Sequence, residues 1–254
     1  VVNTYIKTNN LKQVDEIQKG IVRLYKKDIA KYDPDHKLYL KEIFSLIPSE
    51  LNQKNKRFIL KNLNENFKFS RYENSFIWLK EAGVALPVYC AAEPTSPLLL
   101  SRATNLFKLF ASDVGLLASM YSDGLQLRIL KGEKDINFGS VYENVVAQEL
   151  QTHGFELYYY NSKKQGELDF LIEQSGVVLP IEVKSGKGYT RHAALNNVLS
   201  TGNYAIPQGI VLCNENVQVV ENIVYYPIYM VMFLQKEEEQ EEMIYKPDFS
   251  ALQE

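Results

Sequence analysis

Residues 166–187 read GELDFLIEQSGVVLPIEVKSGK and contain two β-type runs, LDFLI and VVLPIEVK, joined by Gln-Ser-Gly. Side chains alternate between the two faces of a strand, and a Ser-Gly pair suits a two-residue hairpin turn. Counting outward from that turn sets Asp169 opposite Glu182 and leaves Lys184 on the same face. The stretch therefore predicts a β-hairpin that presents two carboxylates and an ammonium on one patch.

The two carboxylates of this hairpin repel each other. Like charges directly opposite on paired strands cost about 0.2–1 kcal/mol. A bound divalent cation offsets that repulsion, because hard cations such as Mg²⁺ bind carboxylate oxygens. Asp169 and Glu182 are therefore candidate metal ligands.

The composition is that of a globular protein with an acidic end. Of the 254 residues, 46% are hydrophobic and 23% are charged, and the formal net charge is −3. Residues 236–254 hold seven acidic side chains and two lysines, so the rest of the chain has a small positive charge. The terminal segment is predicted to be a solvated acidic tail.

The cysteines and the apolar runs favour a cytoplasmic protein without membrane contact. Cys90 and Cys213 are the only cysteines, and each lies in an apolar run, as is typical of buried thiols in a reducing compartment. The longest apolar runs, 82–92 and 223–234, are too short to span a bilayer. No signal peptide is seen, and a start at Val-Val-Asn favours a fragment of a longer protein.

The first part of the chain has the pattern of a helical unit that ends in a β-hairpin. Periodicity and capping residues predict helices at about 1–33, 37–47, 49–63 and 70–82. The run VALPVYCAA and a short segment near 98–101 are β-type and flank a Pro-rich bend. Three helices followed by a β-hairpin predict a winged helix-turn-helix.

Basic side chains are concentrated in residues 50–80 of this unit. They outnumber the acids there by four, an excess that suits contact with a phosphate backbone. The candidate DNA-binding residues are Lys54, Lys56, Arg57, Lys61, Lys68 and Arg71. The alternative is a module that packs on a neighbouring domain and binds no DNA.

The second part of the chain predicts an α/β unit. The predicted elements, in order, are a helix at about 140–152, strands at 155–160, 167–173 and 177–184, a helix at 190–200 and a strand at 209–213. The order is therefore α-β-β-β-α-β. The fold class is α/β, or α+β overall when the helical first part is included.

Asp169, then twelve residues, then Glu182-Val183-Lys184 resembles the PD-(D/E)XK signature of restriction-endonuclease-like nucleases. The setting strengthens the resemblance, because both parts fall on adjacent predicted strands within the element order that this fold uses. The family also places an acid on the preceding helix, where Glu143 matches in SVYENVVAQEL. Ser140 and Glu143 also form a capping-box pattern, and both roles can hold together.

The likeness extends beyond this motif. LKEIFSLIPSEL, FIWLKEAGVALPVY, FKLFASDVGLL and VYENVVAQEL, with GELDFLI and IEVKSGK, resemble the C-terminal half of a group of bacterial AAA-family ATPases. Members of that group join an ATPase module to a winged helix and a PD-(D/E)XK-like domain of unknown function. The resemblance implies a connector or lid end at 1–36, a winged helix at 37–102, a bridging segment at 103–125, a nuclease-fold domain at 126–235 and an acidic tail at 236–254.

The resemblance also implies a chemistry and a set of partners. Asp169 and Glu182, with Glu143, would hold Mg²⁺ or Mn²⁺, and Lys184 would orient the attacking water and stabilise charge on phosphorus. ATP would bind only through an upstream ATPase domain, since no Walker motif occurs in this sequence. The expected partners are DNA and that ATPase domain, with oligomer formation left open.

Other residues give weaker signals. Gln165 and Lys187 flank the hairpin and are candidates for contact with a phosphate, although ordinary solvated side chains explain them as well. His36, His153 and His192 are scattered and have no partner at metal-ligand spacing. Three functions therefore stay open: an active metal-dependent nuclease, a DNA-binding domain that does not cleave, and an interaction module.

Overall fold

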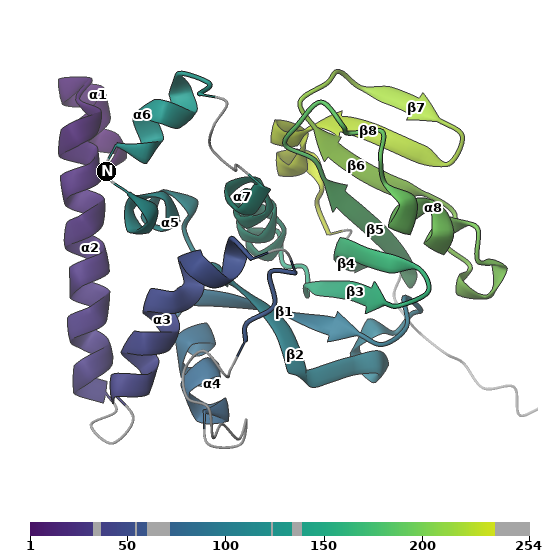
Figure 1. Ribbon diagram of the computed structural model, residues 1–254, viewed down its shortest axis with the longest axis horizontal. Helices are drawn as coiled ribbons and strands as arrows, with labels where there is room; N and C mark the ends of the chain where they lie inside the picture. The colour runs from purple at the N-terminus through teal and green to yellow at the C-terminus, as the bar shows by residue number, and fades with distance from the viewer. Residues whose placement is uncertain (33–36, 54, 60–71, 123, 134–138, 237–254) are drawn as a thin grey trace, which may run out of the picture.

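The computed structural model describes residues 1–32, 37–53, 55–59, 72–122, 124–133 and 139–236. The described strands form one mixed sheet of eight strands, in the order β2-β1-β3-β4-β5-β6-β8-β7 (Figure 1). Helices lie against both faces of this sheet. The predicted α/β class is therefore confirmed.

The elements run along the chain as follows. The strands are β1 (Ala85–Ala91), β2 (Arg102–Ala111), β3 (Tyr158–Ser162), β4 (Gly166–Gln174), β5 (Val177–Val183), β6 (Gly209–Cys213), β7 (Gln218–Val220) and β8 (Ile223–Pro227). The α-helices are α1 (Val2–Thr8), α2 (Leu11–Tyr32), α3 (Lys37–Leu51), α4 (Glu73–Glu81), α5 (Val114–Tyr121), α6 (Leu125–Leu130), α7 (Gly139–Thr152) and α8 (Ala193–Leu199). Short 3₁₀ helices occur at η3 (Leu98–Ser101), η4 (Gly202–Tyr204) and η5 (Ile228–Phe233).

The β4–β5 hairpin forms as the sequence predicts. Ser175 and Gly176 have φ angles of 50° and 75°, and two positive φ angles are what a type I′ turn requires. Gln174 lies opposite Val177, and this pairing sets the register of the pairs that follow. The surrounding order α7-β3-β4-β5-α8-β6 also matches the predicted α-β-β-β-α-β order.

α7 and α8 lie on opposite faces of the sheet (Figure 1). On one face, Val146 and Leu150 of α7 belong to the same core cluster as Phe170 of β4. On the other face, Leu195 of α8 packs in a second cluster with Leu171 of β4. Strands that are covered on both faces consist mainly of apolar residues. A charged side chain within β4 or β5 is therefore enclosed by the protein and needs a partner of opposite charge.

The β1–β2 hairpin is a continuation of the C-terminal sheet and does not form the wing of a separate module. β1 pairs with β3 in parallel, with Tyr89 opposite Tyr158. The segment 103–125, predicted as a bridge, supplies most of β2 together with α5. The physical reason is that pairing with β3 satisfies the backbone groups along the outer edge of β1.

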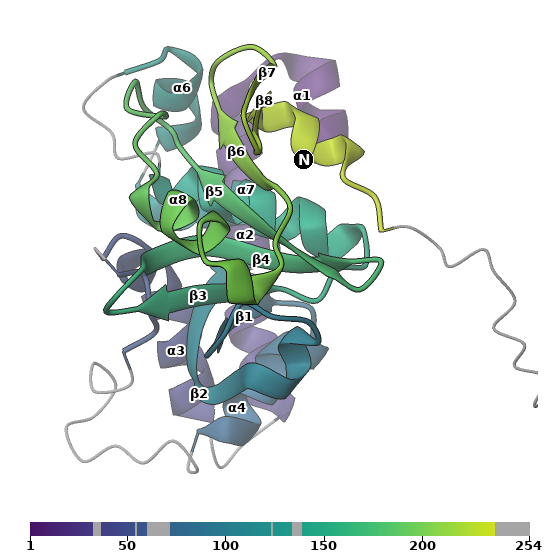
Figure 2. The same cartoon turned by 90° about the vertical axis from the view of Figure 1, so that its right-hand side faces the viewer.

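The predicted helix at 49–63 is wrong for the residues that the structure describes there. α3 continues through Pro48 to Leu51, and residues 55–59 are not helical. Ile43, Ile47 and Leu51 are all fully buried along α3, so tertiary packing outweighs the cost of the internal proline. α3 and α4 lie beside the β1–β2 end of the sheet (Figure 2). The described part of the chain therefore lacks the second helix of the predicted winged helix-turn-helix.

Candidate functional site

β4 and β5 separate at the position of the two predicted acids. The ladder between them ends at the pair Phe170–Ile181, one step before Asp169 and Glu182. Beyond that step, Val183 N donates a hydrogen bond to Asp169 Oδ2 at 2.9 Å. The Asp169 carboxylate thus takes the place of a main-chain acceptor, which fixes it at the opening between the strands.

The register between β3 and β4 also changes around Asp169. Tyr158 pairs with Leu171 and Tyr160 pairs with Leu168, so β4 has one more residue than β3 over this interval. An extra residue bends a strand and redirects the side chains beside it. Leu168 and Leu171 both remain in the core on the α8 face, and Asp169 lies in the redirected interval between them.

Glu182 is buried beside the charged end of Lys184. Lys184 Nζ lies 2.5 Å from Glu182 Oε1. The other oxygen, Glu182 Oε2, is buried and has no hydrogen-bond partner among the described residues. Burial and the charge of Asp169 raise the pKa of Glu182 to about 8, despite the opposing charge of Lys184. Burial lowers the pKa of Lys184, but the charge and hydrogen bond of Glu182, together with the charges of Asp169 and Glu143, outweigh burial and the net shift is upward.

Glu143 joins the same cluster from α7. It is buried, and its Oε1 forms an ion pair with Lys56 from the segment after α3. Burial and the charge of Asp169 raise the pKa of Glu143 to about 7, while Lys108 and Lys56 oppose the shift. Asp169 therefore acts electrostatically on both Glu143 and Glu182, so the structure brings the three predicted acids together.

This closeness does not amount to a three-ligand metal site. Within the residues that the structure describes, no group of three His, Cys, Asp or Glu side chains is arranged to hold a metal ion. Lysines lie against two of the acids, because Lys56 pairs with Glu143 and Lys184 pairs with Glu182. Glu143 Oε2 and Glu182 Oε2 are both buried without a hydrogen-bond partner in the described structure, so each of these acids keeps one unpaired oxygen.

Lys108 of β2 belongs to the cluster although no sequence motif includes it. It is fully buried, and its Nζ lies 2.8 Å from Glu167 Oε1 and 3.8 Å from Asp169 Oδ1. Burial alone lowers its pKa, but the charges of Glu143, Asp169 and Glu167 outweigh burial, so the pKa of Lys108 is raised and the amine stays protonated. The sequence signal is a lysine within the apolar run LFKLFA, because lysine is almost never fully buried unless it is paired.

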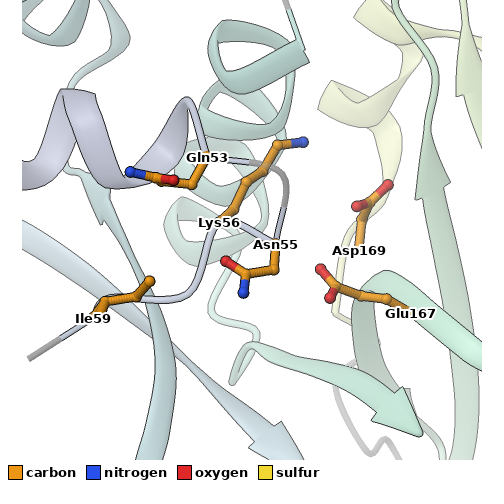
Figure 3. Close-up of a pocket in the computed structure, with 6 residues that line it drawn as sticks. All are labelled: Gln53, Asn55, Lys56, Ile59, Glu167 and Asp169. Atoms are coloured by element: carbon orange, nitrogen blue, oxygen red, sulfur yellow. The ribbon is translucent and has the colours of Figure 1, made fainter. Parts of the chain in front are cut away.

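A cleft of about 480 Å³ opens onto this cluster between β4 and the segment after α3 (Figure 3). The residues that line it are Gln53, Asn55, Lys56, Ile59, Glu167 and Asp169. In Figure 3 the two acids come from one side and the other four residues from the opposite side. Glu167 and Asp169 are partly exposed here, whereas Glu143 and Glu182 are buried.

The predicted DNA-binding residues fall into two groups. Lys54, Lys61, Lys68 and Arg71 lie outside the described residues. Lys56 and Arg57 are described: Lys56 is paired with Glu143, and Arg57 has a buried Nε without a hydrogen-bond partner in the described structure. Of these two residues, Lys56 lines the cleft, whereas the unpartnered Nε of Arg57 is buried.

The two weaker phosphate candidates differ in their surroundings. Gln165 is buried, and its side chain accepts a hydrogen bond from Tyr160 and donates one to Thr201. Those contacts give it a structural role between the β3–β4 turn and the end of α8. Lys187 lies exposed beyond the end of β5.

The fold and the cluster define an α/β protein with a carboxylate–lysine site at the point where two central strands separate. A family model described as Domain of unknown function (DUF8612) matches residues 1–128, just over half of the 254, and the chain belongs to that family. A second model, Domain of unknown function (DUF4143), matches residues 138–231, and that domain occurs in AAA-ATPase-associated proteins. No curated protein and no solved structure is detectably similar to the chain. None of the described helices is both long enough and apolar enough to cross a membrane.

Proposed function

We propose that this chain hydrolyses phosphodiester bonds of DNA with the help of Mg²⁺ or Mn²⁺, as the nuclease-like part of an AAA-family ATPase. The observation that carries the proposal is the buried carboxylate of Glu182, whose Oε2 has no hydrogen-bond partner in the described structure, in the electrostatic neighbourhood of Asp169. An unsatisfied buried carboxylate is costly, so its presence close to Asp169, which lines the cleft, calls for a ligand.

The two acids suit a hard divalent cation. Mg²⁺ is commonly held by one or two carboxylates and keeps several of its waters. Glu182 Oε2 offers an oxygen from the buried side, and Asp169 is in contact with the cleft, from which water and a phosphate have access. A cation bound there polarises a phosphoryl oxygen and lowers the pKa of a coordinated water.

Lys184 supplies a fixed positive charge beside these acids. Its contact with Glu182 holds the amine in place, and its raised pKa keeps it protonated at neutral pH. A preorganised positive charge stabilises the negative charge that develops on phosphorus, and groups of this kind contribute about 10²–10³ in rate. Lys184 is only partly exposed, so its position is set before the substrate arrives.

DNA as the substrate is supported by the basic composition of residues 50–80, which include Lys56 of the cleft lining. These residues hold four more basic than acidic side chains, with Arg57 and Arg71 among them. Arginine is well suited to phosphate contacts because it presents several donors in one plane. The association of DUF4143 domains with AAA ATPases supports an upstream ATPase as the motor partner.

The experiment combines calorimetry with cleavage of supercoiled plasmid. The wild-type chain is expected to bind Mn²⁺ and to nick the plasmid, and Asp169→Asn is expected to lose both properties. Lys184→Met should lower the nicking rate by about 10²–10³ and leave Mn²⁺ affinity within a few-fold of wild type. Lys163→Met, which removes an exposed lysine of the β3–β4 turn, is the matched control. Absence of Mg²⁺ and Mn²⁺ binding at millimolar concentration contradicts the proposal.

A second candidate function is a non-cleaving accessory domain that binds DNA or a protein partner. The observation that favours it is internal charge balance, since Lys56, Lys108 and Lys184 each pair with an acid of the cluster. This alternative predicts DNA binding that weakens linearly on a log–log plot as salt increases, without metal binding or nicking. The metal titration and the plasmid assay therefore separate the two functions.

A further inference from the structure

Lys108 is a buried charge for which the proposed reaction has no use. Its side chain is fully buried, and its amine lies against Glu167 and Asp169 of β4. β2 lies in the region 1–128 that one family model matches, and β4 lies in the region 138–231 that the other matches. An ammonium from one region is thus enclosed beside carboxylates of the other.

The contacts of Lys108 Nζ are those of an ion. Nζ lies 2.8 Å from Glu167 Oε1, a charge-assisted hydrogen bond, and 3.8 Å from Asp169 Oδ1, a longer ion pair. The ring centroid of Tyr159 is 5.1 Å away, within the range of a cation–π contact. The amine is therefore held between two carboxylates of β4, where its positive charge offsets both of them.

The charges of the cluster show what the loss of Lys108 means. The members are the four acids Glu143, Glu167, Asp169 and Glu182 and the three lysines Lys56, Lys108 and Lys184. Glu167 and Asp169 are the two acids in direct contact with Lys108, and removal of Lys108 leaves both carboxylates without the cation that they share. Glu167 and Asp169 then repel each other at the edge of the core, and a replacement cation offsets that repulsion.

We propose that the Lys108 ammonium takes the place of a divalent cation between Glu167 and Asp169, so that removing it creates a divalent-cation site there. Lys108→Ala removes the charge together with its stem, which leaves room for a cation and coordinated water. Both carboxylates line the cleft, so an ion can enter from solvent. In the wild-type chain, Lys108 therefore prevents a second cation from binding beside the pair Asp169 and Glu182.

The inference goes beyond the proposed function, because it concerns the difference between the variant and the wild type and not whether the wild type binds a metal. Mn²⁺ stoichiometry is measured by calorimetry and by electron paramagnetic resonance for the wild type and for Lys108→Ala. The variant is expected to bind one more Mn²⁺ per chain than the wild type. The double variant Lys108→Ala/Glu167→Gln should lose that additional ion, and Lys163→Ala should match the wild type.

Equal Mn²⁺ stoichiometry in Lys108→Ala and the wild type overturns the inference, whether both bind one ion or none. If the wild type binds none and Lys108→Ala binds one, the proposed nuclease function fails and the role of Lys108 stands. If Lys108→Ala does not fold in metal-free buffer, circular dichroism is followed during a Mn²⁺ titration. Recovery of the wild-type spectrum at millimolar Mn²⁺ supports the inference, and a chain that stays unfolded overturns it.

Discussion

The side-chain amide of Asn144 forms hydrogen bonds with both backbone polar groups of Ala111. Asn144 Nδ2 donates to Ala111 O at 2.9 Å, and Ala111 N donates to Asn144 Oδ1 at 2.8 Å. Asn144 is fully buried on α7 next to Glu143, and Ala111 is the last residue of β2. The contact thus joins the strand that carries Lys108 to the helix that carries Glu143.

Asn144→Leu is expected to destabilise the fold substantially. Leucine fills a similar volume but leaves the N–H and the C=O of Ala111 without partners, and each such buried group costs about 1–3 kcal/mol. Urea unfolding should show a lower midpoint for the variant. Gln151→Leu, at an exposed position of the same helix, should leave the midpoint almost unchanged. Equal stability of Asn144→Leu and wild type contradicts the structural role given to this amide.

The β4–β5 hairpin could be predicted because its signal is local. Alternation of apolar and charged side chains sets the two faces, and the Ser-Gly pair selects the turn. Register then follows by counting outward from the turn, so the sequence alone places Asp169, Glu182 and Lys184 near one another. The place of Glu143 in the site could be predicted only from the family resemblance, because the sequence of its own helix does not distinguish a buried acid from a capping residue.

The remaining members of the site depend on contacts between distant segments. Tyr89 lies opposite Tyr158 only in the folded sheet, and no local sequence pattern predicts that β1 pairs with β3. Lys108 reaches Glu167 and Asp169 because of that addition. The helix expected at 49–63 failed for a related reason: a continuous buried face of α3 outweighed the local breaking signal of Pro48.

Gly209→Ala is expected to destabilise the packing of α8 on β6. A Cβ at residue 209 would lie 2.7 Å from Leu195 Cδ1 and 3.3 Å from its Cγ, and Leu195 is fully buried. Overpacking of this kind costs about 1–3 kcal/mol because the neighbour has no free volume to enter. Gly202→Ala is the matched control, since a Cβ there meets nothing within 4 Å. Thermal unfolding should separate the two variants, and equal melting temperatures contradict the close approach.

Stability in metal-free buffer is expected to fall as pH rises between about 4.5 and 8. The folded-state pKa values of Glu143 and Glu182 are about 7 and about 8, above the ordinary value of 4.5. Over that interval the folded chain binds more protons than the unfolded chain, so the free energy of unfolding decreases with pH, by at most about 1.4 kcal/mol per pH unit for each group.

The measurement is urea unfolding in EDTA at several pH values between 5 and 8. Glu182→Gln and Glu143→Gln should each show a shallower decline than wild type, because an amide cannot ionise. In the double variant, positions 143 and 182 should contribute no change in the free energy of unfolding between pH 5 and pH 8. A wild-type stability that rises steadily from pH 5 to pH 8 contradicts the raised pKa values.

Mn²⁺ affinity is expected to increase with pH over the interval in which Glu182 ionises. A protonated carboxyl is a poor ligand, so a cation must displace the proton of Glu182, whose pKa in the metal-free chain is about 8. Release of one proton for each bound ion raises affinity about tenfold per pH unit below that pKa.

Calorimetry at pH 6, 7 and 8 in buffers of different ionisation enthalpy measures both the affinity and the number of protons released. Glu182→Gln should bind Mn²⁺ weakly and without the pH dependence, whereas Glu143→Gln should retain the dependence, because Glu143 lies outside the proposed ligand pair Asp169 and Glu182. The opposite result contradicts this assignment. If Glu143→Gln loses the pH dependence and Glu182→Gln keeps it, the metal ligand is Glu143 of α7 and not Glu182 of β5.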